Sequence, residues 1–178
     1  MAASGFVLPN SYTINLWFRM DSTDTAPDSR IQYLYLKKIS SGANQIYIAV
    51  TNKLLRIYVA GAIYDYSESF STNSNWRYLS VSFYKTSAST TGVQIFLDST
   101  KVAEQTLHAV YTEDAAHEVY VGLDLEGNIY SFEIVPLLNV DKTVPPMLFT
   151  GTCTAYGSTS SCTQCPRTST TAGICLSQ

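Results

Sequence analysis

Two acidic residues are spaced for possible hydrolytic chemistry. Asp124 and Glu126 alternate within Gly122-Leu-Asp-Leu-Glu126. On a strand, alternate residues project to the same side, and two neighbouring carboxyl groups could hydrolyse a glycosidic bond. Glycine stands where a Glu-x-Asp-x-Glu pattern would place its first acid, and the pair abuts a turn at Gly127-Asn128. We therefore interpret both residues as solvated turn acids.

A nucleophile activated by histidine is the second chemistry to consider. The chain has only two histidines, His108 and His117, and its cysteines are confined to the C-terminal end. His108 follows a segment of strand character and His117 precedes one, as surface residues at strand ends often do. Since neither an acid pair nor a nucleophile–histidine pattern is found, we predict that the chain is not an enzyme.

All four cysteines fall within the last 26 residues, in a stretch rich in Ser, Thr and Gly. Such a stretch buries too little apolar surface to fold without cross-links, so we predict two disulfides and an oxidising compartment. Zinc is the alternative, although only one close pair of the kind that zinc sites use is present. Three disulfide pairings are possible. The cysteines are Cys153, Cys162, Cys165 and Cys175.

Composition limits the classes of partner. The chain has 178 residues, a net charge of −3, 46% hydrophobic residues and interspersed charges. Without a basic stripe, nucleic acid is not an expected partner, and no apolar run is long enough to cross a bilayer. Residues 1–5 lack the features of a signal peptide, so a secreted chain would begin after processing or inside a larger protein.

The body of the chain alternates between short β-type segments and turns. Residues 12–20, for example, place Ile14, Leu16 and Phe18 on one face, the period of a half-buried strand. With no convincing helix to make parallel crossovers, the pattern predicts an all-β, antiparallel two-sheet β-sandwich. The ten predicted strands are residues 12–20, 31–39, 45–51, 53–60, 62–67, 76–85, 92–98, 101–107, 117–123 and 127–135.

The change in composition near Pro145-Pro146 predicts two parts. Residues 1–144 would form the sandwich. Residues 145–178 would form a disulfide-bonded tail, or the start of a further module.

Three consecutive segments resemble the laminin-G and pentraxin branch of concanavalin A-like domains. They are Trp76-Arg-Tyr-Leu-Ser-Val-Ser-Phe-Tyr84, Gly92-Val-Gln-Ile-Phe-Leu-Asp98, and Val119-Tyr-Val-Gly122 followed by Gly127-Asn-Ile-Tyr-Ser-Phe-Glu-Ile134. The resemblance covers about residues 6–138 and implies a concanavalin A-like jelly roll. It also implies that the apolar residues of the first two segments face the interior together; these are Leu79, Val81, Phe83, Val93, Ile95 and Leu97.

Two further expectations follow from resemblance. The cysteine spacing of the tail resembles the beginning of the growth-factor-receptor-like cysteine-rich repeats of large surface proteins, which places the chain outside the cell or at its surface. Many laminin-G and pentraxin relatives bind calcium at the rim, so calcium is a possible cofactor, although no ligand string is recognisable and ordinary loop acids are the simpler interpretation. The candidate acids are Asp65, Asp98, Asp114 and Asp124.

Tyrosine is abundant, with thirteen residues in the chain. Tyr58, Tyr64 and Tyr66 crowd one expected hairpin around Gly61, where exposed rings would offer flat faces to a partner. Core filling is the alternative for any one of them. We expect a non-catalytic module for adhesion or assembly that binds a protein partner or copies of itself; a lectin-like, glycan-binding domain, with or without calcium, is the alternative.

Overall fold

The structure is a computed structural model that describes residues 10–20, 30–51, 54–67, 76–98, 100–111 and 118–136. The described residues form ten strands and no helix, so none of them forms a helix that could span a membrane. The strands are β1 (Ser11–Met20), β2 (Gln32–Lys38), β3 (Asn44–Thr51), β4 (Leu54–Val59), β5 (Ala62–Tyr66), β6 (Arg77–Lys85), β7 (Thr91–Leu97), β8 (Thr100–Leu107), β9 (Glu118–Val121) and β10 (Gly127–Val135).

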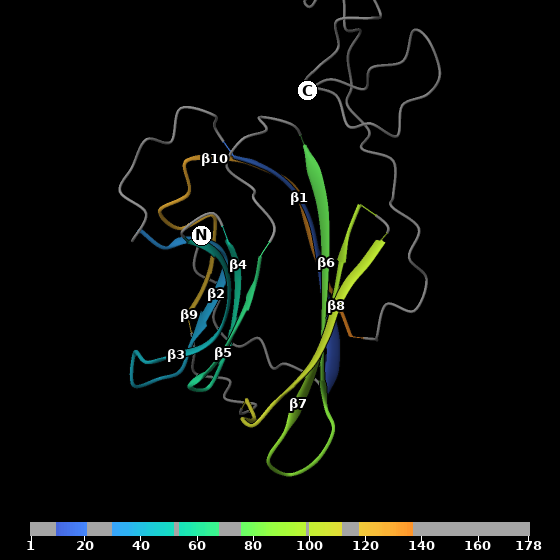
Figure 1. Cartoon of the computed structure of the whole chain (residues 1–178). Helices are drawn as coiled ribbons and strands as arrows, with labels where there is room; N and C mark the ends of the chain where they lie inside the picture. Colours follow the sequence, from blue (N-terminus) through green and yellow to red (C-terminus); the bar gives the residue numbers. More distant parts are fainter. Residues whose placement is uncertain are drawn as a thin grey trace, which may run out of the picture.

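The strands form two five-stranded sheets that face each other (Figure 1). Sheet A has the order β10-β1-β6-β7-β8, and sheet B has the order β5-β4-β3-β2-β9. The strand pairs described within each sheet are antiparallel. The predicted antiparallel β-sandwich of the jelly-roll type is therefore confirmed.

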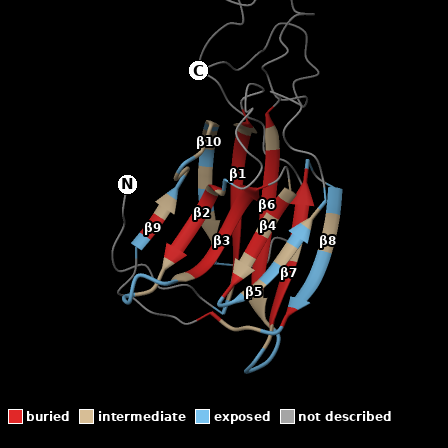
Figure 2. Cartoon of the chain, turned by 60° about the vertical axis from the view of Figure 1, so that its left-hand side comes forward, coloured by how far each residue is buried: buried red, intermediate tan, exposed pale blue. Residues whose placement is uncertain are grey.

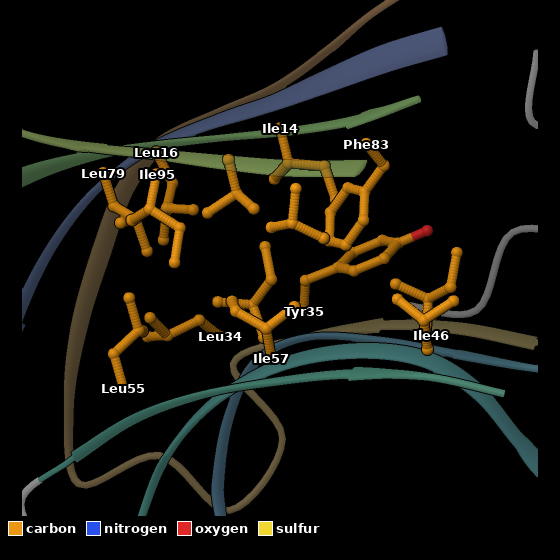
Figure 3. Close-up of a cluster of buried hydrophobic side chains, with 14 of the residues drawn as sticks. Ile14, Leu16, Leu34, Tyr35, Ile46, Leu55, Ile57, Leu79, Phe83 and Ile95 are labelled. Atoms are coloured by element: carbon orange, nitrogen blue, oxygen red, sulfur yellow. The ribbon is translucent and has the colours of Figure 1, made fainter. Parts of the chain in front are cut away.

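The inner faces of the two sheets build one hydrophobic core (Figure 3). Leu79, Val81 and Phe83 pair with residues of β7 and face the interior, as the sequence predicted. In Figure 3, Ile14, Leu16, Leu79, Phe83 and Ile95 come from sheet A, and Leu34, Tyr35, Ile46, Leu55 and Ile57 from sheet B. This core fixes the register of both sheets, because a slip by one residue would turn every inner side chain outward.

A short turn joins β4 to β5, and its geometry matters for the site. Ala60 and Gly61 both have positive φ, at 44° and 101°, and Val59 pairs with Ala62. Positive φ at both central residues is typical of the two-residue turns that suit the twist of a hairpin. The turn therefore sets which residues of β5 lie opposite those of β4.

Two core tyrosines carry buried hydroxyls. Tyr12 stacks on Phe83, with ring centroids 5.2 Å apart, and Tyr35 stacks on Phe132 at 5.9 Å. Neither hydroxyl has a hydrogen-bond partner among the residues that the structure describes. Burial raises the pKa of Tyr12 and the pKa of Tyr35 well above the ordinary value.

This arrangement predicts alkaline sensitivity. Above about pH 10 tyrosine ionises in the unfolded chain while the buried hydroxyls stay protonated, so the free energy of unfolding should fall by about 1.4 kcal/mol per pH unit for each. Below pH 10 this stability is fully present. Tyr35→Phe should make the fall less steep, as measured by urea unfolding between pH 8 and pH 11. An unchanged slope in that variant would show that Tyr35 ionises freely in the folded protein.

The cysteines and the boundary between residues 144 and 145 lie outside the described residues. The disulfide tail and the two-part organisation therefore stay predictions. Asp114 and His117 also lie outside them.

Candidate functional site

The outer face of sheet B carries a row of large side chains that crosses all five strands. Strand pairing places Tyr120 of β9 opposite Leu36 of β2, and Leu36 opposite Tyr47 of β3. Tyr47 in turn lies opposite Tyr58 of β4, which lies opposite Ile63 of β5. We call these five residues the aromatic row. Cross-strand neighbours of this kind stand about 5 Å apart, so the row is continuous.

The rings of the row are held in place by one another. Tyr47 and Tyr58 stack with centroids 4.6 Å apart and ring planes 2° from parallel. Tyr33 packs edge-on against Tyr47 at 5.4 Å. Leu36 and Tyr47 are only 1% and 5% exposed and form the buried base of the row, and the partly exposed rings of Tyr33, Tyr58 and Tyr120 lie around them. A surface of rings that are already ordered loses little conformational entropy on binding.

Ile63 ends the row at the edge strand. With 52% of its surface exposed, it is the most exposed of the large hydrophobic residues that the structure describes. Its neighbour Tyr58 is partly exposed. This end of the row is therefore the most accessible apolar part of the face, which is where a partner would gain most from apolar contact.

Charged groups flank the rings. Arg56 donates two hydrogen bonds to the carboxylate of Asp65, Nε to Oδ1 and Nη2 to Oδ2, each 2.7 Å long. These bonds to Asp65 are the main reason that the pKa of Arg56 is raised. Lys38 Nζ lies 5.2 Å from the centre of the Tyr120 ring. The face thus combines flat apolar surface with oriented polar groups.

Tyr120 is tied to its own strand. Its hydroxyl donates to Glu118 Oε2 at 2.6 Å, and this hydrogen bond is the largest cause of the raised pKa of Tyr120. The ring is thereby oriented with Lys38 over it. Electrostatic attraction between a cation and a ring face is worth about 0.5–1 kcal/mol at exposed sites.

The three tyrosines predicted from the sequence do not share a face. Tyr58 belongs to the aromatic row, whereas Tyr64 and Tyr66 turn inward and pack against the core. The reason is the register of the β4–β5 hairpin, in which Tyr64 lies opposite Ile57 and Tyr66 opposite Leu55, both core residues. The crowding expected around Gly61 is thus divided between the two sides of sheet B.

Three other members of the face were not singled out from the sequence: Tyr33, Tyr47 and Tyr120. A register shift in β2, between Tyr33 and Tyr35, turns Tyr33 outward while both Leu34 and Tyr35 face the core. Alternation alone would have placed Tyr33 and Tyr35 on one face. For Tyr47, the signal was available, because Ile46, Ile48 and Val50 alternate with it.

The candidate acids are placed as follows. Asp124 is exposed, with φ of 55°, in the turn between β9 and β10, and Glu126 forms an ion pair with Arg30. Asp65 is held by Arg56, and Asp98 by an ion pair with Arg77 and by the backbone N–H of Tyr78 at 2.9 Å. Among the described residues, no three His, Cys, Asp or Glu side chains gather as metal ligands would.

The fold and the face together define a jelly-roll β-sandwich with an ordered aromatic surface on one sheet. No protein-family model matches the sequence, and no curated protein sequence matches it. Solved structures match in fold.

Two of the solved structures that the chain is similar to are a toxin domain and a lyase. The receptor binding domain of botulinum neurotoxin mosaic serotype C/D aligns with a TM-score of 0.52 and 12% identity, over 71% of this chain and 33% of that one. The endo-β-1,4-glucuronan lyase of the fungus Trichoderma reesei aligns with a TM-score of 0.51 and 17% identity, over 67% of this chain and 58% of the lyase. At this identity the likeness shows the fold, which is shared by proteins of unrelated function.

Proposed function

We propose that this chain is a non-catalytic interaction module of an extracellular or cell-surface protein, and that it binds its partner through the aromatic row of sheet B. The observation that carries the proposal is the continuity of the row across five strands, ending at the exposed Ile63. Aromatic anchors beside apolar and charged groups are the usual make-up of binding surfaces. The partner is a protein or a second copy of the chain, in adhesion or in a larger assembly.

Glycan binding is the second candidate, and the polar groups of the face favour it. Sugar rings stack on flat aromatic side chains while their hydroxyls need oriented donors and acceptors. The Arg56–Asp65 pair and Lys38 stand beside the rings of Tyr58 and Tyr120 in this way. A receptor binding domain and a polysaccharide lyase share the fold, which is compatible with either candidate.

The experiment that tests the proposal changes the exposed end of the row. The double variant Tyr58→Ser and Ile63→Ser should lower the melting temperature by only a few degrees, because Ile63 is exposed and Tyr58, although stacked on Tyr47, is partly exposed. Its affinity for the partner should fall by roughly 30-fold, the equivalent of about 2 kcal/mol. Adhesion, self-association and a glycan array, with and without chelator, are the readouts.

A matched control lies on the opposite sheet. Lys101→Ser and Gln105→Ser change two exposed residues of the edge strand β8 and should leave binding unchanged. Intact binding in the Tyr58/Ile63 variant would remove the aromatic row from the proposal. Binding to sugars on the array would support glycan binding in place of a protein partner. Loss of that binding with chelator would show that it depends on calcium.

The non-catalytic part of the proposal has a separate test. The unmodified chain should release no sugar from polysaccharides, since Asp124 lies in an exposed turn and Glu126 is paired with Arg30. Release that disappears when both acids are replaced would overturn it.

The tail is part of the same proposal. We expect two disulfides among Cys153, Cys162, Cys165 and Cys175. They would belong to a cysteine-rich segment that follows the laminin-G-like sandwich. Mass spectrometry should find the chain lighter by four hydrogens than its reduced form, two for each bond. Four free thiols or bound zinc would contradict this prediction.

A further inference from the structure

Part of the outer face of sheet A, which points away from sheet B, is as buried as the core: the part that β1 and β6 form. Strand pairing places Thr13 opposite Ser82, and Asn15 opposite Ser80. All four residues are at most 8% exposed. The hydroxyls of Thr13 and Ser82 share a hydrogen bond, with their oxygens 2.8 Å apart. Figure 2 shows β1 and β6 buried over most of their length, while the edge strand β8 is largely exposed. In a sheet with one face in water, buried and exposed residues would alternate along each strand.

Aromatic side chains continue this buried face. Trp17 of β1 lies opposite Tyr78 of β6, and both pack with Trp76 in a cluster that Tyr130 adjoins. Their exposed fractions are 9% or less for Trp17, Trp76 and Tyr78. Arg19 lies over Trp76, with its guanidinium carbon 5.4 Å from the ring centre. Surface aromatic residues of this size would be largely exposed if nothing lay over them.

Three polar atoms on this side of β1 point to the same conclusion. Asn15 Oδ1, Trp17 Nε1 and Arg19 Nε are buried, and none has a hydrogen-bond partner among the described residues. Their residues alternate along one strand, so the atoms lie on one side of the sheet. A buried polar atom without a partner costs about 1–3 kcal/mol, which backbone donors and acceptors of a covering segment would offset.

No described strand covers this face. Apart from β5 and β8, the strands in substantial contact are neighbours within one sheet. Sheet B packs on the inner face of sheet A through the common core. The described strands therefore do not supply a cover for this part of the face.

The sequence singles out one segment as the cover. Residues 137–149 contain seven large apolar residues, against four in residues 1–9, whereas residues 21–29, 68–75 and 112–117 are mostly polar and carry acids. The apolar residues of the segment are Leu137, Leu138, Val140, Val144, Met147, Leu148 and Phe149.

The segment also starts in the right place. β10 ends at Val135, which pairs with Thr13 at the edge of the buried face. Thirteen extended residues reach about 43 Å, while the face runs about 20 Å along β1 from Thr13 to Arg19. The segment can therefore cover the whole length of the face.

We propose that residues 137–149 of this chain bind the outer face of sheet A, cover the Trp17–Trp76–Tyr78 cluster, and so hold the cysteine-bearing tail against the sandwich. The tail would then move with the sandwich as one body. Force or binding at the tail would act directly on β1, the central partner of both β10 and β6.

Tryptophan fluorescence tests this proposal directly, because Trp17 and Trp76 are the only tryptophans of the chain. In a chain that ends at Pro136, the emission should shift to the red and quenching by acrylamide should become severalfold stronger than in the full chain. Deletion of residues 1–9, the other segment with several apolar residues, is the matched control and should change neither.

Point variants in the full chain keep the test valid if the shortened chain fails to fold. Leu148→Ser with Phe149→Ser should strengthen quenching, while Thr168→Ala with Thr170→Ala in the distal tail should not. Unchanged quenching in the first pair would overturn the proposal. It would also be overturned if the deletion of residues 1–9 exposed the tryptophans, or if dilution of the full chain exposed them, since a second copy would then be the cover.

Discussion

Replacing Phe83 by alanine is expected to lower the free energy of unfolding by about 3–5 kcal/mol. The ring is fully buried in the core between the two sheets and stacks on Tyr12. Its removal leaves a cavity between two rigid sheets that cannot collapse into it without shifting the register of β6. Since a domain of this size is stable by only about 5–15 kcal/mol, the loss should be plain in a guanidinium titration.

Phe83→Leu is the matched control, because leucine keeps most of the buried volume. It should cost clearly less than Phe83→Ala. An alanine variant with an unchanged midpoint would contradict the pairing of Phe83 with Val93, on which the placement of the whole inner face depends.

The strands were predictable because their signals are local. Residues 127–135 were predicted as a strand and form β10 with the same bounds. The strand predicted for residues 31–39 is β2, which is one residue shorter at each end. Apolar alternation and turn residues act within a few positions, so they predict a strand independently of the long-range contacts of the chain. Ends shift by a residue or two because pairing with a neighbour decides them.

Long-range pairing decides what the sequence left open. β10 pairs with β1, and β9 with β2, although each pair is far apart in the chain. The shift in β2 that divides Tyr33 from Tyr35 has no local signature. The sequence does contain the signal that places Tyr58 and Tyr64 on opposite faces of sheet B, since a two-residue turn at Ala60 and Gly61 fixes the register of the hairpin.

The outer face of β1 is the clearest departure from the sequence-based prediction. Alternation in residues 12–20 predicted a half-buried strand, yet Thr13 and Trp17 are as buried as the inner residues. A hydrophobic pattern reports the face that meets the core and does not show whether the other face is covered as well. Trp17 was the available signal, because a large aromatic residue in the middle of a polar face calls for a cover.

Gly127→Ala is expected to lower the free energy of unfolding by roughly 3–5 kcal/mol, through the pairing of β10 with β1. Gly127 pairs with Met20 and has φ of 156°, and a Cβ built on it would lie 2.1 Å from the carbonyl oxygen of Arg19. Backbone strain alone costs about 1–3 kcal/mol, and the carbonyl cannot yield without moving the start of the β1–β10 ladder.

Gly42→Ala separates the clash from the loss of glycine's conformational freedom. Gly42 also has positive φ, at 81°, but a Cβ there meets nothing within 4 Å, so its replacement should cost only about 1–2 kcal/mol. Hydrogen exchange should then show faster opening of β10 in Gly127→Ala and an unchanged β10 in Gly42→Ala. Because Tyr130 follows on the same strand and adjoins the Trp17 cluster, Gly127→Ala should also loosen the buried outer face of sheet A and strengthen tryptophan quenching. Equal costs for the two variants would mean that β10 tolerates the displaced carbonyl and that this ladder does not hold the face in place.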